Sequence, residues 1–374
     1  MSETVDPHRD DAASDGAQSG HLRDIWTQPP TFGQQHHAEL PHSDNGFAAY
    51  IEPDVVIDPK QIRIGLWGSP RSGKTTYLAA LRVAALDAVG GYDWVVSGRN
   101  RASQEFIIDK VNQLVDKLEF PPPTLGVNEL AWNFHGNRES RAGNWFARLI
   151  ERMTANGSGD PDMDFEVHLQ DAAGETYGDK ALREHFDSMM RHLMHAHGIV
   201  YLFDPIGNSQ EDVTSFKFFF STLEHLSARM RDEGMLERGL LPQDVSVCVT
   251  KFDDPGVLKA AMQAGVVYQE NEGAIPRVPP EIAADFLASI CVDDRSRLVL
   301  NSLKKYFQKD RIRYFATSSI GFHVDPKRGF DFDDLTNVDT TDGVPKLRSA
   351  PNPINTLEPI ISLAQRIQRR LETR

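Results

Sequence analysis

The pattern of hydrophobic and polar positions changes near residue 60, and from there on it predicts strands. Four short runs rich in aliphatic and aromatic residues lie at 62–67, 198–203, 245–249 and 312–316. The run at 198–203, GIVYLF, has no charged residue, which suits a strand buried on both faces of a parallel sheet. The runs at 130–134 and 165–170 alternate between apolar and polar residues, as half-buried and often antiparallel strands do.

Between these strands, apolar residues recur at helical spacing. The predicted helices lie at 75–87, 103–119, 181–196, 210–233 and 354–372, with a long helical connection at 256–308. Because strands alternate with helices, we predict an α/β fold with a mostly parallel sheet covered by helices on both sides.

The first 60 residues have a different composition from the remainder. They are rich in Asp, Ser, Gly, Pro and His and hold few aliphatic residues, so they cannot bury enough surface to offset the entropy cost of ordering. We therefore predict a disordered N-terminal tail over 1–60 and a single enlarged domain over 61–374. Within that domain, 135–161 and 256–300 are predicted insertions.

The loop after the first strand carries the strongest functional signal. Residues 68–75 read GSPRSGKT and match the P-loop pattern G-x-x-x-x-G-K-[ST] between a predicted strand and a predicted helix. Successive N–H groups at a helix N-terminus can cradle phosphates, and Pro70 removes only one of these donors. Lys74 would neutralise phosphate charge, and the Thr75 hydroxyl would bind Mg²⁺. The predicted phosphate-binding residues of this loop are Gly68, Arg71, Ser72, Gly73, Lys74, Thr75 and Thr76.

A second segment follows the strand that ends at residue 170. It reads DAAGE over 171–175. The Asp171 carboxylate at a strand tip can hold Mg²⁺ directly or through water. Gly174 lets its N–H approach the γ-phosphate, which makes it a further candidate phosphate-binding residue.

Two later segments predict which base is bound. After the strand at 245–249 the chain reads TKFD, so that the Asp253 carboxylate can accept hydrogen bonds from guanine N1–H and its 2-amino group. The Lys251 stem can lie along the base plane. The last strand ends in ATSS over 316–319, where a backbone N–H can donate to guanine O6. The candidate guanine-binding residues are Thr250, Lys251, Asp253, Ser318 and Ser319.

Together the P-loop, the DxxG element at 171–174 and the [NT]KxD element at 250–253 resemble the Ras-like GTPases of the TRAFAC class of P-loop proteins. The resemblance covers about 62–320 and the closing helix. It implies a three-layer P-loop NTPase fold whose mostly parallel sheet has one antiparallel strand, with helical insertions. It also implies Mg²⁺-dependent hydrolysis of GTP to GDP and phosphate.

The insertions and the closing segment 353–359, PINTLEP, are similar to bacterial TRAFAC-clade proteins of the double-GTPase kind. That likeness implies a molecular switch in a bacterial signalling or conflict system.

Some positions depart from the family pattern. Thr250 stands where Asn is commoner, and Glu175 stands where many relatives place a Gln that orients the attacking water. Lys74 and Glu175 are the candidate catalytic residues. The Glu175 carboxylate could act as a base, but the negative γ-phosphate would repel it, so we expect slow hydrolysis without a partner. Thr124 is the candidate switch-I threonine, a Mg²⁺ ligand in the family. No arginine finger is assigned: Arg71, Arg138 and Arg141 are candidates, but the favoured interpretation of each is a surface arginine.

Composition limits the partners. The 374 residues include 54 acidic and 40 basic side chains, a formal charge of -14. An acidic surface argues against general binding to nucleic acid, and we expect protein partners instead. The chain has no apolar run long enough to span a membrane, no secretory signal pattern and only two cysteines, so we expect a cytoplasmic protein.

Two other functions stay open from the residues alone. One is a nucleotide-binding module that acts by assembly and hydrolyses little. The other is a P-loop ATPase or small-molecule kinase, in which Asp253 would have no role in base recognition.

Overall fold

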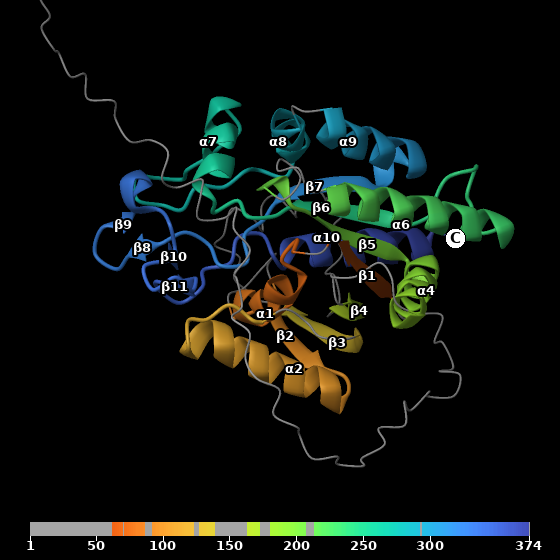
Figure 1. The fold of residues 1–374 in the computed structure, drawn as a ribbon, viewed down its shortest axis with the longest axis horizontal. Coiled ribbons are helices and arrows are strands. Elements are labelled where there is room, and N and C mark those ends of the chain that lie inside the picture. The colour runs from red at the N-terminus through yellow and green to blue at the C-terminus, as the bar shows by residue number, and fades with distance from the viewer. Residues whose placement is uncertain are drawn as a thin grey trace, which may run out of the picture. The chain divides into compact units, whose positions relative to one another are not determined.

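The computed structural model describes residues 62–69, 71–86, 92–122, 127–138, 163–172, 180–206, 213–291 and 294–373, which belong to one compact unit spanning Ile57–Arg374. At its centre is a seven-stranded sheet in the order β2-β3-β4-β1-β5-β6-β7 (Figure 1). The strands are β1 (Arg63–Gly68), β2 (Tyr92–Gly98), β3 (Val127–Arg138), β4 (Met163–Ala172), β5 (Gly198–Phe203), β6 (Asp244–Val249) and β7 (Ile312–Ala316).

The direction of the strands confirms the predicted fold class. β1 pairs in parallel with β4 and β5, and β5, β6 and β7 continue the parallel arrangement. β3 runs antiparallel to both of its neighbours, β2 and β4. The sheet is therefore mostly parallel with one antiparallel strand, as in a P-loop NTPase fold.

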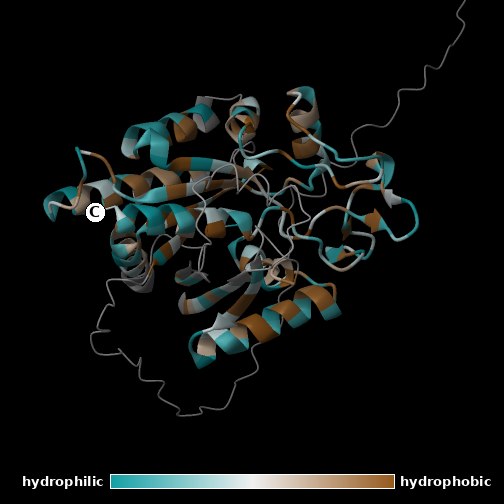
Figure 2. Ribbon diagram, turned by 180° about the vertical axis from the view of Figure 1, so that it is seen from behind, coloured by the Kyte–Doolittle hydropathy of each residue, from teal (hydrophilic) through white to brown (hydrophobic). Residues whose placement is uncertain are grey.

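Helices cover both faces of the sheet. One face holds α1 (Lys74–Ala84), α2 (Arg101–Val111) and α10 (Glu358–Glu372); the other holds α4 (Lys180–His195), α6 (Val213–Asp232), α7 (Pro255–Gln263), α8 (Ala283–Ile290) and α9 (Asp294–Tyr306). β5 shows why the layers form: Ile199 and Tyr201 pack into one hydrophobic cluster, whereas Val200 and Leu202 pack into the other. Hydrophobic and hydrophilic residues alternate along the helices, as expected when only one side of each helix packs on a sheet (Figure 2).

Several details differ from the sequence-based expectations. β2 was not predicted, because Val95 interrupts the alternation of buried Trp94 and Val96. The helix expected at 103–119 is α2 followed by a π-helix, η2 (Asn112–Asp116). The long helical connection expected at 256–308 consists of three helices, and the chain between α7 and α8 includes Gly265 and Gly273, both at positive φ.

The chain between β7 and α10 also holds structure that was not predicted. It contains the short strands β8 (Val324–Asp325), β9 (Gly329–Phe330), β10 (Val338–Asp339) and β11 (Lys346–Leu347) and the 3₁₀ turn η4 (Phe332–Asp334). Another 3₁₀ turn, η3 (Lys309–Arg311), lies directly before β7. β3 extends to Arg138 and β4 begins at Met163, so most of the predicted insertion at 135–161 lies outside the described residues, as does the predicted tail. Among the described helices, none combines the length and apolar character needed to cross a membrane.

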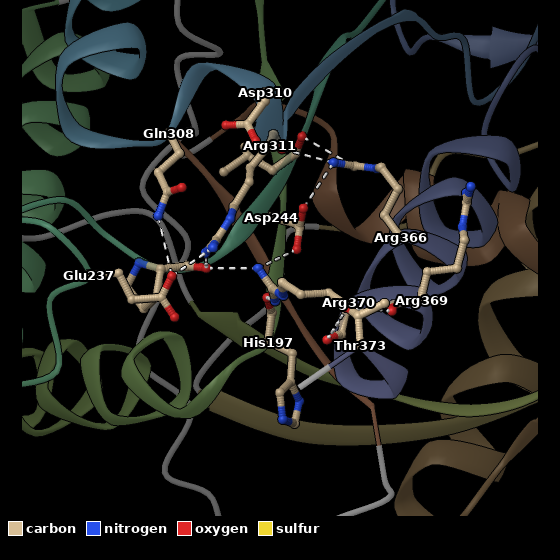
Figure 3. A network of polar contacts seen from close by, with 12 residues as sticks. His197, Glu237, Asp244, Gln308, Asp310, Arg311, Arg366, Arg369, Arg370 and Thr373 are labelled. Carbon is tan, nitrogen blue, oxygen red and sulfur yellow. Dashed lines mark hydrogen bonds and ion pairs between the residues drawn. The ribbon is translucent and has the colours of Figure 1, made fainter.

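A buried polar network ties α10 to the amino ends of the central strands (Figure 3). Asp244, at the start of β6, forms ion pairs with Arg370 at 2.7 Å and with Arg366 at 3.3 Å. Arg366 also donates to the carbonyl of Arg311 at 2.8 Å, and Arg311 pairs with Glu237 at 2.6 Å. This network lies at the edge of the sheet opposite the P-loop, where it anchors the last helix.

Candidate nucleotide-binding site

The predicted site segments all follow strands at the same edge of the sheet. β1 ends at Gly68 and leads into the P-loop, and β4 ends at Ala172. β6 leads into 250–253, and β7 leads into 317–319. Because these strands are parallel, their carboxyl ends share one edge, which is where ligands bind in such sheets.

Lys74 folds over the P-loop that precedes it. Its Nζ donates to the carbonyls of Gly68 at 3.0 Å and Ser69 at 2.8 Å. Gly73 caps α1 with a φ of 86°, a left-handed conformation that glycine adopts at little cost, and Arg71 also has a positive φ of 63°. The loop thus brings its backbone to the N-terminus of α1, where the helix dipole favours an anion.

Close packing within the loop explains its first glycine. A Cβ added at Gly68 would lie 2.6 Å from the Ser72 Oγ and 3.1 Å from Leu202. Ser72 is fully buried, its N–H donates to the Ser69 carbonyl at 3.2 Å, and its hydroxyl has no hydrogen-bond partner among the described residues. An orphaned hydroxyl inside a loop of this kind is consistent with a site that is completed by a ligand.

The residues predicted to hold Mg²⁺ lie on adjacent elements. Thr75 is the second residue of α1 and Asp171 is the second-last residue of β4. β1 and β4 are paired in parallel, with Ile64 opposite Val167. Gly68 and Asp171 are equally far along their strands from this pair, so their backbones lie at the same level of the sheet. Hydroxyl and carboxylate oxygens are ligands that Mg²⁺ accepts, so the donor set fits this metal.

The loop after β6 is fastened to β5. The Thr250 N–H and hydroxyl both donate to the Phe203 carbonyl, at 2.9 and 3.1 Å. Lys251 has a φ of 59°, and its Nζ forms an ion pair with Asp204 at 2.7 Å. Thr250 therefore acts through the backbone of β5, and Lys251 is held at the end of the same strand.

Asp253 and Ser318 meet although 65 residues separate them in the chain. The Ser318 hydroxyl donates to Asp253 Oδ1, and the Phe252 N–H donates to the Thr317 carbonyl at 3.1 Å. Burial raises the pKa of the Asp253 carboxyl to about 6, and the Ser318 hydrogen bond opposes that shift. At neutral pH the carboxyl is mostly ionised and can accept hydrogen bonds from a base.

Backbone contacts limit which N–H group of residues 317–319 can donate to guanine O6. The Thr317 N–H donates to the Val249 carbonyl at 2.8 Å, and the Ser318 N–H donates to the Ile354 carbonyl at 3.0 Å. In the part of the chain that the structure describes, the N–H of Ser319 has no acceptor. Ser319 is thus the residue of this loop whose backbone can donate to a ligand.

Two residues that the sequence did not predict as site residues support the loops at 250–253 and 317–319. Asp204, whose side chain is only 4% exposed, holds Lys251. Asn355 is buried at a φ of 47°, and its Nδ2 donates to the Ala316 carbonyl at 2.9 Å, which fixes the end of β7. The position of Asp204 directly after an apolar strand was a usable signal, whereas no local pattern marks Asn355.

Some predicted residues cannot be placed. Thr124, Gly174, Glu175 and Arg141 lie outside the described residues. Arg71 is exposed at the P-loop. Arg138 is the last residue of β3, whereas Val127, at the other end of that strand, is the residue that pairs with Ala172 at the end of β4. Within the described residues, no group of three or more His, Cys, Asp or Glu side chains is arranged to hold a metal ion.

Comparisons with known proteins identify no family for this chain. No family model matches the chain, and no curated protein does. Among solved structures, a Plasmodium falciparum protein given the name nucleolar GTP-binding protein 1 matches 85% of this chain and 91% of its own, with 10% identity and a TM-score of 0.33. A likeness this remote assigns neither a family nor a ligand.

Proposed function

We propose that this protein is a regulatory GTPase, which binds a guanine nucleotide with Mg²⁺ and hydrolyses GTP to GDP and phosphate. The observation that carries the proposal is that the P-loop and the Asp253–Ser318 pair lie at the same edge of the sheet. A P-loop serves any nucleoside triphosphate. A carboxylate held at the same edge of the sheet adds an acceptor for guanine N1–H and the 2-amino group, donors that adenine does not offer.

The residues divide the task between phosphate and base. Lys74 would exchange its contacts with the Gly68 and Ser69 carbonyls for phosphate oxygens, and the N–H groups before α1 would donate to the same phosphates. Thr75 and Asp171 would hold Mg²⁺, which would supply charge neutralisation in phosphoryl transfer. Because such a transfer needs mainly positioning and electrostatic stabilisation, these groups suffice for slow hydrolysis.

The proposed role is a molecular switch. The two nucleotide states would differ in the loops near Thr124 and Gly174, and a protein partner would read that difference. We propose that the switch acts in a cytoplasmic signalling or conflict system, and the resemblance of segment 353–359 to bacterial double-GTPase proteins supports this proposal. Glu175 in place of a water-orienting Gln supports slow turnover until a partner completes the site.

The rival function is an assembly module that binds the nucleotide but hydrolyses little. Glu175 favours this rival over a fast enzyme. Single-turnover hydrolysis of GTP, measured with and without candidate neighbouring proteins, separates the two. Hydrolysis that no partner accelerates would favour the assembly module.

Nucleotide binding by the full chain tests the proposal directly. In the presence of Mg²⁺ we expect GTP and GDP to bind at least about 100-fold more tightly than ATP, because adenine leaves Asp253 without its donors. Lys74→Ala should weaken both guanine nucleotides by about 10- to 100-fold through loss of charge-assisted hydrogen bonds. Lys259→Ala, which removes an exposed lysine of α7, is the matched control. Equal affinity for ATP and GTP would refute the guanine assignment.

A further inference from the structure

A small hydrophobic cluster, separate from the two main ones, joins three parts of the candidate site. Its buried members are Ala79, Leu114, Ile320 and Leu347. Ala79 belongs to α1, the helix after the P-loop, and Leu114 belongs to η2. The half-buried side chains of Leu118, Phe120 and Val338 pack against the cluster.

Two of these residues, Ile320 and Leu347, come from one excursion of the chain, which we call the link segment (319–353). It leaves the site after Ser318 and returns at Ile354, and these two residues pair through N–H···O bonds of 3.0 and 2.8 Å. Next to them, the Asn352 N–H donates to the Ile320 carbonyl at 2.9 Å. Both ends of the link segment are therefore fixed beside the serine that contacts Asp253.

Close approach at Gly321 shows how tightly those ends are packed. Gly321 has a φ of 66°, and a Cβ there would lie 1.8 Å from the Asn352 carbonyl oxygen. Its N–H donates to the Ser318 Oγ at 2.8 Å, so the same hydroxyl accepts from the link segment and donates to Asp253. A single hydroxyl group therefore contacts both Asp253 and Gly321.

The far part of the link segment touches the chain that leads toward the predicted switch I. The Leu347 N–H donates to the Leu118 carbonyl at 2.7 Å, and Lys346 and Glu119 form an antiparallel bridge. Leu118 has a φ of 56°, a conformation that residues other than glycine adopt only when their surroundings hold them there. The contacts of β11 supply such a constraint.

Asn337 braces the link segment from inside. It is only 1% exposed, its Nδ2 donates to the Ile320 carbonyl at 3.2 Å, and its Oδ1 accepts from both the N–H and the hydroxyl of Ser349. Ser349 lies two residues beyond Leu347. The near and far parts of the link segment are therefore joined by satisfied buried hydrogen bonds, which favour a single rigid arrangement.

We propose that Leu347 is a positioning residue through which guanine binding at Ser318 orders residues 114–120. This proposal rests on the proposed function, because it needs a guanine nucleotide to bind at Asp253 and Ser318. Coupling between sites travels through packed and hydrogen-bonded contacts, and here each step is present: the Ser318 hydroxyl to the N–H of Gly321, the adjoining Ile320 to Leu347, and Leu347 to Leu118. Guanine recognition and the switch loop would thereby respond to each other.

Hydrogen exchange of the full chain, with and without Mg²⁺–GDP, tests the proposal. In the unaltered protein we expect GDP to slow exchange about tenfold in the P-loop and also in 114–120. In Leu347→Ala the P-loop should still be protected, whereas the effect of GDP on 114–120 should be lost and GDP should dissociate a few times faster. Val344→Ala, at a 62% exposed position of the same segment, is the control and should behave like the unaltered protein.

The outcomes separate the two proposals. A protein in which GDP protects no segment would refute the proposed function and this inference together. Protection of the P-loop with unchanged exchange in 114–120, or full protection of 114–120 in Leu347→Ala, would refute the positioning role alone. If Leu347→Ala does not fold, Ile320→Val removes one methylene group from the same cluster and should show a smaller loss of coupling in the same direction.

Discussion

Lys251 Nζ lies 2.7 Å from Asp204 Oδ2, and this ion pair joins the loop after β6 to the end of β5. The carboxylate is 4% exposed and the lysine side chain is 38% exposed, so the lysine stem reaches inward from the surface. Asp204 Oδ1 accepts from the Ile206 N–H at 3.0 Å, which fixes the carboxylate itself. The stem of Lys251 is therefore held in place before any base lies beside it.

Asp204→Ala tests that relationship. Without its partner the Lys251 stem gains rotamer freedom, which must be lost again when a base binds. We expect the affinity for GDP to fall about tenfold, equivalent to about 1.4 kcal/mol. Asp187→Ala, which removes an exposed ion pair with Arg229, is the control and should leave GDP affinity unchanged. An unchanged affinity in Asp204→Ala would show that Lys251 needs no such support.

Two neighbouring aspartates offer a matched pair of variants. Asp253 contacts Ser318, whereas Asp254 caps α7 by accepting from the N–H groups of Gly256 and Val257. Asp253→Asn should weaken the preference for GTP over ATP, because an amide replaces one acceptor by a donor. Asp254→Asn should keep that preference, since Asn also caps helices well. Competition binding with both nucleotides measures the ratio, and equal ratios in the two variants would contradict the role of Asp253.

Guanine recognition should depend on pH through Asp253. Burial raises the pKa of this carboxyl to about 6, and only the ionised form accepts from both donors of guanine. The ratio of GDP to ADP affinity should therefore be constant above about pH 7 and fall as the pH drops through 6. The ratio is the useful measurement because the phosphates of both nucleotides titrate alike. A ratio independent of pH between 5 and 8 would contradict this role.

The same pKa has a consequence for stability without nucleotide. A carboxyl whose pKa is raised on folding binds more protons in the folded than in the unfolded state between about pH 4 and pH 6. Its contribution to stability therefore falls as the pH rises through that window. Asp253→Asn should remove this loss. The free energy of unfolding of the variant minus that of the unaltered protein, measured by urea titration, should therefore rise as the pH increases from 4 to 7. A difference between the two proteins that stays constant over that range would contradict this.

The network at the opposite edge of the sheet predicts a loss of stability without a loss of binding. Burial raises the pKa of Asp244, and the neighbouring Arg366 and Arg370 oppose that shift. Asp244→Ala would leave both arginines, 11% and 20% exposed, without this counter-charge. We expect urea denaturation to show a loss of about 3–5 kcal/mol, whereas GDP affinity per folded molecule should be unchanged. Arg369→Ala on the exposed side of α10 is the control, and an equal loss in both variants would count against the network.

Local patterns were enough to predict much of this molecule. The strand, loop and helix around Lys74 form as expected because Gly73 and the flanking apolar runs act within a few residues. The segments at 250–253 and 317–319 could be placed at one sheet edge for the same reason, since parallel strands alternating with helices fix where their ends lie. The single antiparallel strand, β3, followed from the resemblance to Ras-like proteins and from its polar–apolar alternation.

Only the tertiary structure decided the rest. The Asp253–Ser318 contact, the ion pair of Lys251 with Asp204 and the cluster around Leu347 all join residues far apart in the chain. The pKa of Asp253 depends on its burial, and Ser319 is singled out within 317–319 because the N–H groups of Thr317 and Ser318 donate to Val249 and Ile354. The sequence by itself determined where the candidate phosphate-binding and base-binding segments lie along the chain, because those signals are local. Which residues hold them in place depended on long-range packing, which no local period encodes.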